Sequence, residues 1–364
     1  MKIAIVHDYI KEFGGAERVL KTLTEMFPEA PIYTAFRVRG STADKEFTGK
    51  KIIESWLSPI LKTGNLYSPL RFLIPVIWSS FDLSKYDLVI TSSSWYVTRG
   101  FKVGQKTKVI NYCHTPPRWL YGFETSVGFI KYWPVKLYAK IVGNYIRRYD
   151  LKTSQKVDFF IANSKNVAGR IETFYGRKSV VIYPPVDVEK IITDTKEVKK
   201  EDFYLIASRL TGAKGIEKAI EFSKGLGFKL KIVGESSGYS SIERNNKNNI
   251  DFLGRLGDVE LYKTYAKAKA LITLAQDEDF GMTAVESQAA GTPVIAFNGG
   301  GFKETVIDRV TGVLINEVTE KSFSEAIKKI RNTTWDKEKL ISNAKKFSKE
   351  KFKKEMADFI AKNV

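Results

Sequence analysis

Residues 270–297 read A-L-I-T-L-A-Q-D-E-D-F-G-M-T-A-V-E-S-Q-A-A-G-T-P-V-I-A-F, which is the pattern of one strand–helix–strand unit. The apolar run Ala270–Leu274 predicts a buried strand, a helix is expected from about Gly281, and Val294–Ala296 predicts the next strand. Two strands that follow one another through a helix lie parallel in one sheet. This stretch therefore indicates an α/β fold with a parallel sheet.

The same alternation of short apolar runs and helical patterns extends over most of the chain. It is interrupted after Tyr183–Asp187 (Y-P-P-V-D) by a polar, lysine-rich stretch, where we place a linker. We therefore expect two doubly wound sheets. The other expected strands are Lys2–Tyr9, Leu88–Ser92, Lys108–Cys113, Val157–Ala162, Phe203–Ser208, Leu230–Val233 and Ile250–Leu253, with helices from about Gly15, Gly215 and Asp258.

The length of 364 residues favours two domains, because one domain typically takes about 100–200 residues. We expect an N-terminal domain over residues 1–187, a second domain over 188–345, and a C-terminal helix over 346–364 that packs back on the first domain. Ligands of open α/β sheets bind beyond the carboxyl ends of the strands. Two such sheets facing each other would enclose a central cleft that holds the site.

The composition is that of a globular protein with a strongly basic surface. Lysine and arginine number 59 against 41 aspartate and glutamate, so the formal net charge is +18, which favours contact with polyanions or an anionic membrane. The single cysteine, Cys113, fits a reducing compartment. The run Ile3–Val6 is too short for a secretory signal, and no stretch approaches the ~20 apolar residues of a spanning helix. We expect a cytoplasmic protein, with peripheral contact with the inner face of the cytoplasmic membrane as an alternative.

Two carboxylates, Glu278 and Glu286, flank the expected start of the helix in the opening stretch. A loop that leads from a strand into a helix presents free backbone N–H groups, which suit phosphate and sugar hydroxyls. The string from Glu278 to Pro293 resembles the E-x7-E signature of the family-4 retaining glycosyltransferases. The resemblance implies that Glu278 faces the donor sugar and that Glu286 holds the ribose. It assigns further donor contacts to Phe280, Gly281, Met282 and Thr283.

A second string, A-S-R-L-T-G-A-K-G, ends the strand Phe203–Ser208 and supplies Arg209 and Lys214. A nucleoside diphosphate gains negative charge as it leaves, and preorganised cations stabilise that charge. The resembling family uses an arginine and a lysine at these positions for the donor diphosphate. The D-x-D pattern at Asp277–Asp279 suggests a metal site instead. Because two cations can replace a metal, we expect a metal-independent enzyme without a cofactor.

Other candidate residues also follow expected strands. Gly14 and Gly15, in F-G-G-A-E-R, would let the backbone approach a ligand closely, and the resemblance places this loop over the donor phosphate and the acceptor. It also places His114 beside the donor sugar, where the residue steadies positive charge. The glycines of N-G-G-G-F-K-E (Asn298–Glu304) are expected to admit a ligand. The resemblance assigns Gly254 and Arg255 to the nucleotide base, and the acceptor candidates are His7, Asp8 and Arg118. For His7 and Asp8 a purely structural strand-end hydrogen bond is an equal alternative.

Longer strings resemble a narrower group, the WbaZ-like mannosyltransferases of polysaccharide and O-antigen assembly. They are H-T-P-P-R-W, R-R-Y-D, V-D-F-F-I-A-N-S-K-N-V-A-G-R-I and V-I-Y-P-P-V-D. The resemblance implies the GT-B fold, in which two Rossmann-like domains face a central cleft, with the acceptor on the N-terminal side and the nucleotide-sugar donor on the C-terminal side. For R-R-Y-D and its neighbours, packing within the protein is as good an explanation as ligand contact.

The expected function is therefore that of a retaining hexosyltransferase. It would transfer mannose from GDP-mannose to a glycan or lipid-linked acceptor. A UDP-sugar donor and a nucleotide-sugar epimerase on the same fold are alternatives within this chemistry. A non-catalytic basic protein that binds nucleic acid or a membrane surface is the alternative of another class, but no nucleic-acid-binding signature is present and no nucleic acid is expected.

One expected helix has an apolar face surrounded by basic residues. A helix that faces the core and keeps a solvated basic side is the preferred interpretation, and a helix resting on anionic lipid is the alternative. The apolar residues are Tyr138, Ile141, Val142, Tyr145 and Tyr149, and the basic ones are Lys131, Lys136, Lys140, Arg147, Arg148 and Lys152.

Overall fold

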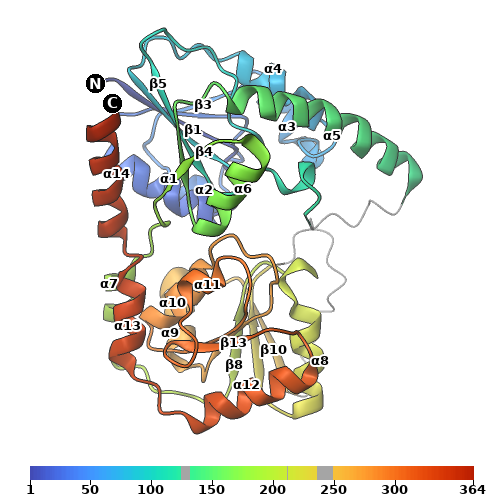
Figure 1. The fold of residues 1–364 in the computed structure, drawn as a ribbon, viewed down its shortest axis with the longest axis vertical. Helices are drawn as coiled ribbons and strands as arrows, with labels where there is room; N and C mark the ends of the chain where they lie inside the picture. The colour runs from blue at the N-terminus through green and yellow to red at the C-terminus, as the bar shows by residue number, and fades with distance from the viewer. Residues whose placement is uncertain (124–131, 211, 236–248) are drawn as a thin grey trace. The chain divides into compact units, whose positions relative to one another are not determined.

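The computed structural model describes residues 1–123, 132–210, 212–235 and 249–364 (Figure 1). The chain divides into two compact units. Unit 1 runs from Met1 to Pro185 and takes in Phe352–Val364, whereas unit 2 runs from Val186 to Lys351. The first boundary lies two residues before the expected 187/188 position, and the second lies six residues after the expected 345/346 position.

In its described residues, unit 1 contains a seven-stranded parallel sheet in the order β3-β2-β1-β4-β5-β6-β7. The central strands β1, β4 and β5 are almost entirely buried, because helices cover both faces of the sheet. The strands are β1 (Ile3–His7), β2 (Ile32–Thr34), β3 (Ile52–Glu54), β4 (Leu88–Ser93), β5 (Lys108–Cys113), β6 (Phe159–Ala162) and β7 (Ser179–Val181). The helices are α1 (Gly15–Met26), α2 (Thr42–Glu46), α3 (Ser58–Leu61), α4 (Ile74–Ser79), α5 (Trp133–Ser154), α6 (Lys165–Tyr175) and most of α14 (Lys349–Asn363).

Helix α14 is the last element of the chain, yet it belongs to the core of unit 1. Phe352, Met356 and Ile360 are buried in one hydrophobic cluster with residues of α1 and the sheet. The ring of Phe352 lies 5.7 Å from that of Tyr112 in β5, edge to face. A C-terminal helix that packs back on the first domain was expected from the sequence, and α14 occupies that position.

Unit 2 contains, in its described residues, a six-stranded parallel sheet in the order β10-β9-β8-β11-β12-β13. Its strands are β8 (Tyr204–Ala207), β9 (Leu230–Val233), β10 (Ile250–Gly254), β11 (Leu271–Thr273), β12 (Val294–Phe297) and β13 (Gly312–Ile315). Its helices are α7 (Val188–Asp194), α8 (Ile216–Leu226), α9 (Asp258–Lys267), α10 (Met282–Ala289), α11 (Phe302–Thr305), α12 (Glu320–Asn332) and α13 (Lys337–Lys345).

Two parallel α/β sheets are therefore confirmed, and every strand expected above is present. Four further strands, β2, β3, β7 and β13, were not expected from the sequence. The first three have only three residues each, and β3 and β7 lie at the two edges of their sheet. Such short runs carry too few alternations to stand out from loop sequence.

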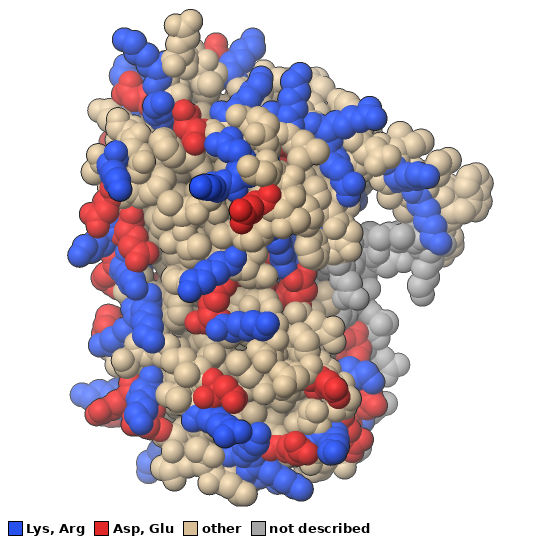
Figure 2. All heavy atoms as spheres, in the orientation of Figure 1, with Lys and Arg blue, Asp and Glu red and all other residues tan. Residues whose placement is uncertain are grey.

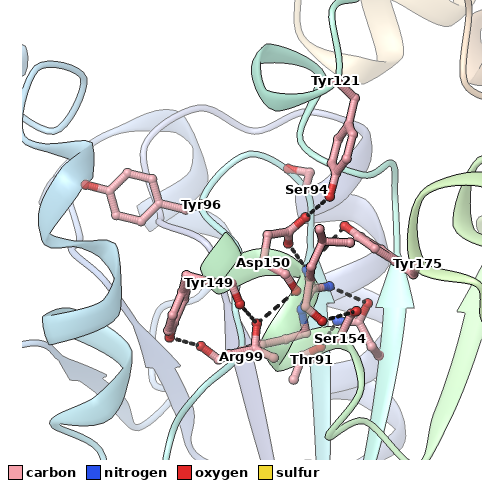
Figure 3. Close-up of polar contacts among 12 residues, drawn as sticks. Thr91, Ser94, Tyr96, Arg99, Tyr121, Tyr149, Asp150, Ser154 and Tyr175 are labelled. Atoms are coloured by element: carbon pink, nitrogen blue, oxygen red, sulfur yellow. Dashed lines mark hydrogen bonds and ion pairs between the residues drawn. The ribbon is translucent and has the colours of Figure 1, made fainter. Parts of the chain in front are cut away.

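A buried ion pair ties α5 to the sheet of unit 1 (Figure 3). Arg99, which follows β4, pairs through Nη2 with Oδ1 of Asp150 on α5, and both side chains are almost fully buried. The other carboxylate oxygen of Asp150 accepts a hydrogen bond from the hydroxyl of Tyr121 at 2.7 Å. Arg99 also donates to the hydroxyl of Tyr175 on α6 at 3.2 Å, and its carbonyl accepts from the hydroxyl of Tyr149 at 2.6 Å.

This network gives the R-R-Y-D string a packing role, because Tyr149 and Asp150 are its last two residues. Burial alone would lower the pKa of Arg99, but the interactions with Tyr175 and Asp150 outweigh it and raise that pKa. The guanidinium therefore stays charged inside the core, where it is matched by a carboxylate.

Candidate active site

Two of the predicted site residues meet at the carboxyl end of the sheet in unit 2. Lys214 Nζ lies 2.6 Å from Glu278 Oε2. Lys214 ends a short turn of helix after β8, and Glu278 lies in the loop after β11, the neighbouring strand. Both side chains remain partly accessible, at 27% and 18% exposure. A cation and a carboxylate thus stand together at an open edge of the sheet.

The backbone holds these two loops close together. Gly215 has φ +68°, and a Cβ built there would lie 2.8 Å from the Cβ of Leu274, just beyond β11. A side chain at this position would therefore clash, which explains why glycine follows Lys214. The position of Lys214 beside Glu278 is consequently fixed by backbone packing as well as by charge.

The loop 278–281 leads into α10, and residues that follow β12 pack against it. Gly281 precedes the helix with φ +91°, and a Cβ there would lie 2.7 Å from the ring of Phe302. The amide of Gly301 donates to the carbonyl of Glu278 at 2.8 Å, and a Cβ on Gly301 would lie 2.4 Å from Cα of Phe280. The glycines of Asn298–Glu304 were expected to admit a ligand. In the structure, Gly300 and Gly301 lie against the backbone of the 278–280 loop, where a side chain would not fit.

The predicted donor residues around α10 differ in exposure. Phe280 is buried, with its ring 5.3 Å from that of Phe347, so only its backbone is suited to a ligand. Met282 and Thr283, the first residues of α10, are partly exposed. Glu286 is 5% exposed and accepts a hydrogen bond from the hydroxyl of Tyr265 on α9 at 3.0 Å.

The remaining predicted donor residues lie at neighbouring strand ends of the same sheet. Arg209 is exposed two residues after β8. Gly254 ends β10 with φ +66° at an irregularity in its pairing with β9, and exposed Arg255 follows it. Strands β10, β9, β8 and β11 are consecutive in the sheet. The carboxyl ends of parallel strands meet at one edge, so unit 2 gathers these predicted residues along that edge.

In unit 1, His7 and His114 are joined through a serine. His7 ends β1 and His114 follows β5, and both are buried. Ser92, near the end of β4 between these two strands, lies 3.0 Å from His7 Nδ1 and 2.8 Å from His114 Nε2. Burial and, to a lesser degree, His7 lower the pKa of His114 to about 3. The His114 ring is therefore neutral near pH 7.

The glycine-rich loop of unit 1 is connected to this group. Gly14 caps α1, Gly15 begins it, and the amide of Gly14 donates to Glu17 Oε2 at 2.9 Å. Glu17 Oε1 lies 3.4 Å from His7 Nε2. Ser92 and Glu17 were not among the site residues expected from the sequence. Glu17 could have been found from its place three residues after the helix cap, whereas Ser92 is 85 residues from His7 and no sequence signal links them.

Asp8 and Arg118 have other surroundings. Oδ2 of buried Asp8 accepts hydrogen bonds from the amide and hydroxyl of Ser94 at 3.0 and 2.7 Å and from the amide of Trp95 at 2.7 Å. Burial raises the pKa of Asp8. The strand-end hydrogen bonds considered for Asp8 are therefore present. Arg118 is half-buried at the start of a short 3-10 turn, where its carbonyl accepts from the amides of Tyr121 and Phe123.

No group of three or more His, Cys, Asp or Glu side chains could hold a metal ion among the residues that the structure describes. Independence of a metal remains a prediction. None of the described helices combines the length and the apolar character needed to cross a membrane.

Two family models together match the chain from residue 13 to residue 347. "Glycosyltransferase Family 4" matches residues 13–190, and "Glycosyl transferases group 1" matches residues 187–347. The junction of the two matches falls where unit 1 passes into unit 2. The chain belongs to glycosyltransferase family 4. The resemblance drawn from Glu278, Glu286, Arg209 and Lys214 thus led to the correct family.

Individual relatives of this family 4 glycosyltransferase are distant. An uncharacterized glycosyltransferase of Methanocaldococcus jannaschii, MJ1178, is 30% identical over 57% of this chain and 59% of its own length. The O-antigen chain mannosyltransferase RfbU of Salmonella typhimurium is 26% identical over 65% of this chain and 69% of its own.

Solved structures establish the fold of the family 4 chain. Alr3699/HepE of Anabaena, solved with UDP-glucose, matches all of this chain and all of its own with a TM-score of 0.68 at 17% identity. The chain therefore has the GT-B fold that the resemblance implied.

Proposed function

We propose that this glycosyltransferase transfers mannose from GDP-mannose to a glycan or lipid-linked acceptor, with retention of the anomeric configuration and without a metal. The observation that carries the proposal is the 2.6 Å pair of Lys214 and Glu278 beside the start of α10. The pair supports the proposal because a cation, which suits a diphosphate, lies next to a carboxylate, which suits sugar hydroxyls. The choice of mannose is supported by the likeness to RfbU, an O-antigen chain mannosyltransferase.

In the proposed reaction the bond between the anomeric carbon and the diphosphate breaks while the acceptor oxygen bonds to the same face of that carbon. The diphosphate leaves toward Lys214 and Arg209, which stabilise its growing charge. The proton of the acceptor hydroxyl passes to a diphosphate oxygen, so no nucleophilic side chain is needed. His114, whose pKa is about 3, is neutral and does not repel the positive charge that develops on the sugar.

A panel of nucleotide sugars tests the donor. GDP-mannose should raise the melting temperature more than UDP-glucose or UDP-galactose, because a ligand at 100 times its Kd stabilises the native state by about 2.7 kcal/mol. Transfer should continue in EDTA, and NMR of the product should show the anomeric configuration of the donor. A larger shift of the melting temperature with a UDP-sugar would show that the donor is a UDP-sugar and not GDP-mannose. Hydrolysis or epimerisation of the donor in the absence of an acceptor would show that the reaction is not transfer.

A surface of unit 1 supports membrane contact of this enzyme. Trp133, Leu137, Ile141 and Tyr145 repeat every four residues along α5 and are 50–75% exposed, so they form one apolar stripe, here called the α5 stripe. Exposed Lys136 and Lys140 lie beside it, and Lys131 falls outside the described residues. In Figure 2 the projecting end of α5 is mostly tan, which marks uncharged residues, with basic side chains next to it.

The structure corrects the expected face of this helix. The core-facing residues are Val142, Ile146 and Asp150, whereas Ile141 and Tyr145 point to solvent on the α5 stripe. A soluble protein rarely exposes such a contiguous apolar row, and lysines beside it would attract anionic headgroups. We therefore propose that the α5 stripe rests on the surface of an anionic membrane.

Vesicle sedimentation tests the membrane surface. The protein should bind vesicles that contain anionic phosphatidylglycerol, bind phosphatidylcholine vesicles weakly, and lose binding as salt is added. Leu137→Ser with Ile141→Ser should weaken binding at least tenfold. The matched control changes two exposed aliphatic residues elsewhere in unit 1, Val103→Ser with Val180→Ser. Equal losses in both double variants, or binding that ignores lipid charge, would contradict the proposal.

A further inference from the structure

We propose that Glu17 and Ser92 are positioning residues of this transferase. They form, with His7, a hydrogen-bonded chain that determines which ring nitrogen of His114 carries the proton. The effect on transfer rests on the function proposed above, whereas the protonation pattern itself does not. All four residues belong to unit 1.

The chain of contacts is continuous, and it is buried except at Glu17, whose side chain is 12% exposed. Glu17 Oε1 lies 3.4 Å from His7 Nε2. On the other side of the His7 ring, Nδ1 lies 3.0 Å from the Ser92 hydroxyl, which in turn lies 2.8 Å from His114 Nε2. Ser92 is fully buried, His7 is 1% exposed and His114 is 8% exposed. A buried hydroxyl between two imidazole nitrogens has one proton to donate and must accept from the other ring.

Glu17 sets the direction of the whole chain. An ionised carboxylate can only accept, so the proton of His7 lies on Nε2. A singly protonated His7 then has a lone pair on Nδ1, to which the Ser92 hydroxyl donates. The Ser92 oxygen therefore accepts from His114 Nε2–H. Consequently, the remaining nitrogen of His114, Nδ1, keeps a lone pair.

This pattern matters because His114 is neutral, with a pKa of about 3 caused mainly by its burial. A neutral imidazole has one donor and one acceptor nitrogen, and they exchange roles when the proton moves. In the expected form Nδ1 is a hydrogen-bond acceptor. An acceptor suits a donor-sugar hydroxyl and adds no positive charge beside a developing oxocarbenium ion.

Glu17→Gln distinguishes a positioning role from a merely structural one, because a merely structural Glu17 would leave the histidine protons where they are. Glu17 Oε2 accepts from the amide of Gly14 at 2.9 Å, so the glutamine carbonyl should take that place and turn its NH₂ group toward His7. An NH₂ group donates, so His7 must carry its proton on Nδ1. Ser92 must then donate to His114 Nε2, and the proton of His114 must move to Nδ1. One conservative substitution should thus move the proton from Nε2 to Nδ1 on both histidine rings.

The measurement is ¹⁵N NMR of the full-length protein labelled at histidine. The chain has two histidines, so four ring nitrogens account for the spectrum, and protonated and unprotonated nitrogens differ widely in shift. The wild type should show Nε2–H on both rings, and Glu17→Gln should show Nδ1–H on both. Ser92→Ala should leave His7 as in the wild type and give His114 a mixture of the two forms.

Two matched controls should keep the wild-type pattern. Glu29→Gln removes an exposed carboxylate just beyond α1, and Ser93→Ala removes the next hydroxyl of β4, which alternation places on the other face of the sheet. Melting curves verify that each variant is folded. The protonation pattern is overturned if the wild type has Nδ1–H on His114, if His7 carries both protons, or if Glu17→Gln changes neither ring.

Transfer assays then test the positioning role. Glu17→Gln should lower kcat by about tenfold to a hundredfold with little change in KM for the donor, because the altered contact acts on the transition state. If Glu17→Gln moves the proton to Nδ1 on both rings but leaves kcat unchanged, the positioning role of Glu17 and Ser92 is overturned. Absence of transfer by the wild type with every nucleotide sugar would instead overturn the proposed function, while the NMR result would still decide the hydrogen-bonded chain.

Discussion

Lys214→Ala should reduce transfer by about 10²- to 10³-fold, which is the usual loss when one preorganised group is removed from a charge that develops in the transition state. The protein should remain folded, because Lys214 and Glu278 are partly exposed and such pairs contribute only about 0–1 kcal/mol to stability. Steady-state kinetics with the donor identified by thermal shift, together with a melting curve, measure both effects.

The matched control for this variant is Lys218→Ala on α8, which breaks an exposed ion pair with Glu221 at 2.9 Å and should leave kcat unchanged. Lys214→Arg keeps the charge but alters its shape, so it should fall between the wild type and the alanine variant. Near-normal transfer by Lys214→Ala would refute the role of this lysine in holding the diphosphate.

Asp150→Ala should lower the free energy of unfolding of unit 1 by about 3–5 kcal/mol, because it leaves Arg99 charged and uncompensated in the core. It also removes the acceptor of the Tyr121 hydroxyl. Urea titration followed by circular dichroism and by tryptophan fluorescence measures the loss. Five of the six tryptophans precede residue 134 and therefore report on unit 1.

Two comparisons separate burial from charge pairing in this prediction. Glu46→Ala breaks the pair of Lys21 and Glu46, which lie 2.6 Å apart but are exposed, and should cost less than about 1 kcal/mol. Arg99→Met combined with Asp150→Leu removes both charges and should recover part of the stability lost in Asp150→Ala. An Asp150→Ala variant as stable as Glu46→Ala would show that the buried pair contributes little.

The fold could be predicted because parallel strands covered on both faces appear as continuous apolar runs. Ile3–Val6 and Val294–Phe297 are such runs, and a helix follows each of them, α1 and α11. The edge strands Ile52–Glu54 and Ser179–Val181 could not be predicted, because three residues that are only partly buried form no recognisable pattern. Local signals, in short, identify the centre of a sheet better than its borders.

The candidate site could be predicted only where its residues lie close together in one segment of the sequence. Glu278–Pro293 holds a loop and a helix start together, so the arrangement could be read directly. Ser92 has its partners at His7, in β1, and at His114, just after β5, and only the strand order brings them together. The α5 stripe also needed the structure, because a helical pattern shows that faces exist and not which of two apolar faces is covered.

The position of α14 has a consequence for biosynthesis. A ribosome makes the chain from Met1 onward, and the core of unit 1 needs Phe352, Met356 and Ile360. All of unit 2 has therefore been synthesised before unit 1 can bury its last apolar side chains. Until then, Tyr112 and Phe159 lack the rings of Phe352 and Phe359 that pack against them, so unit 1 can complete its core only after unit 2 has been synthesised.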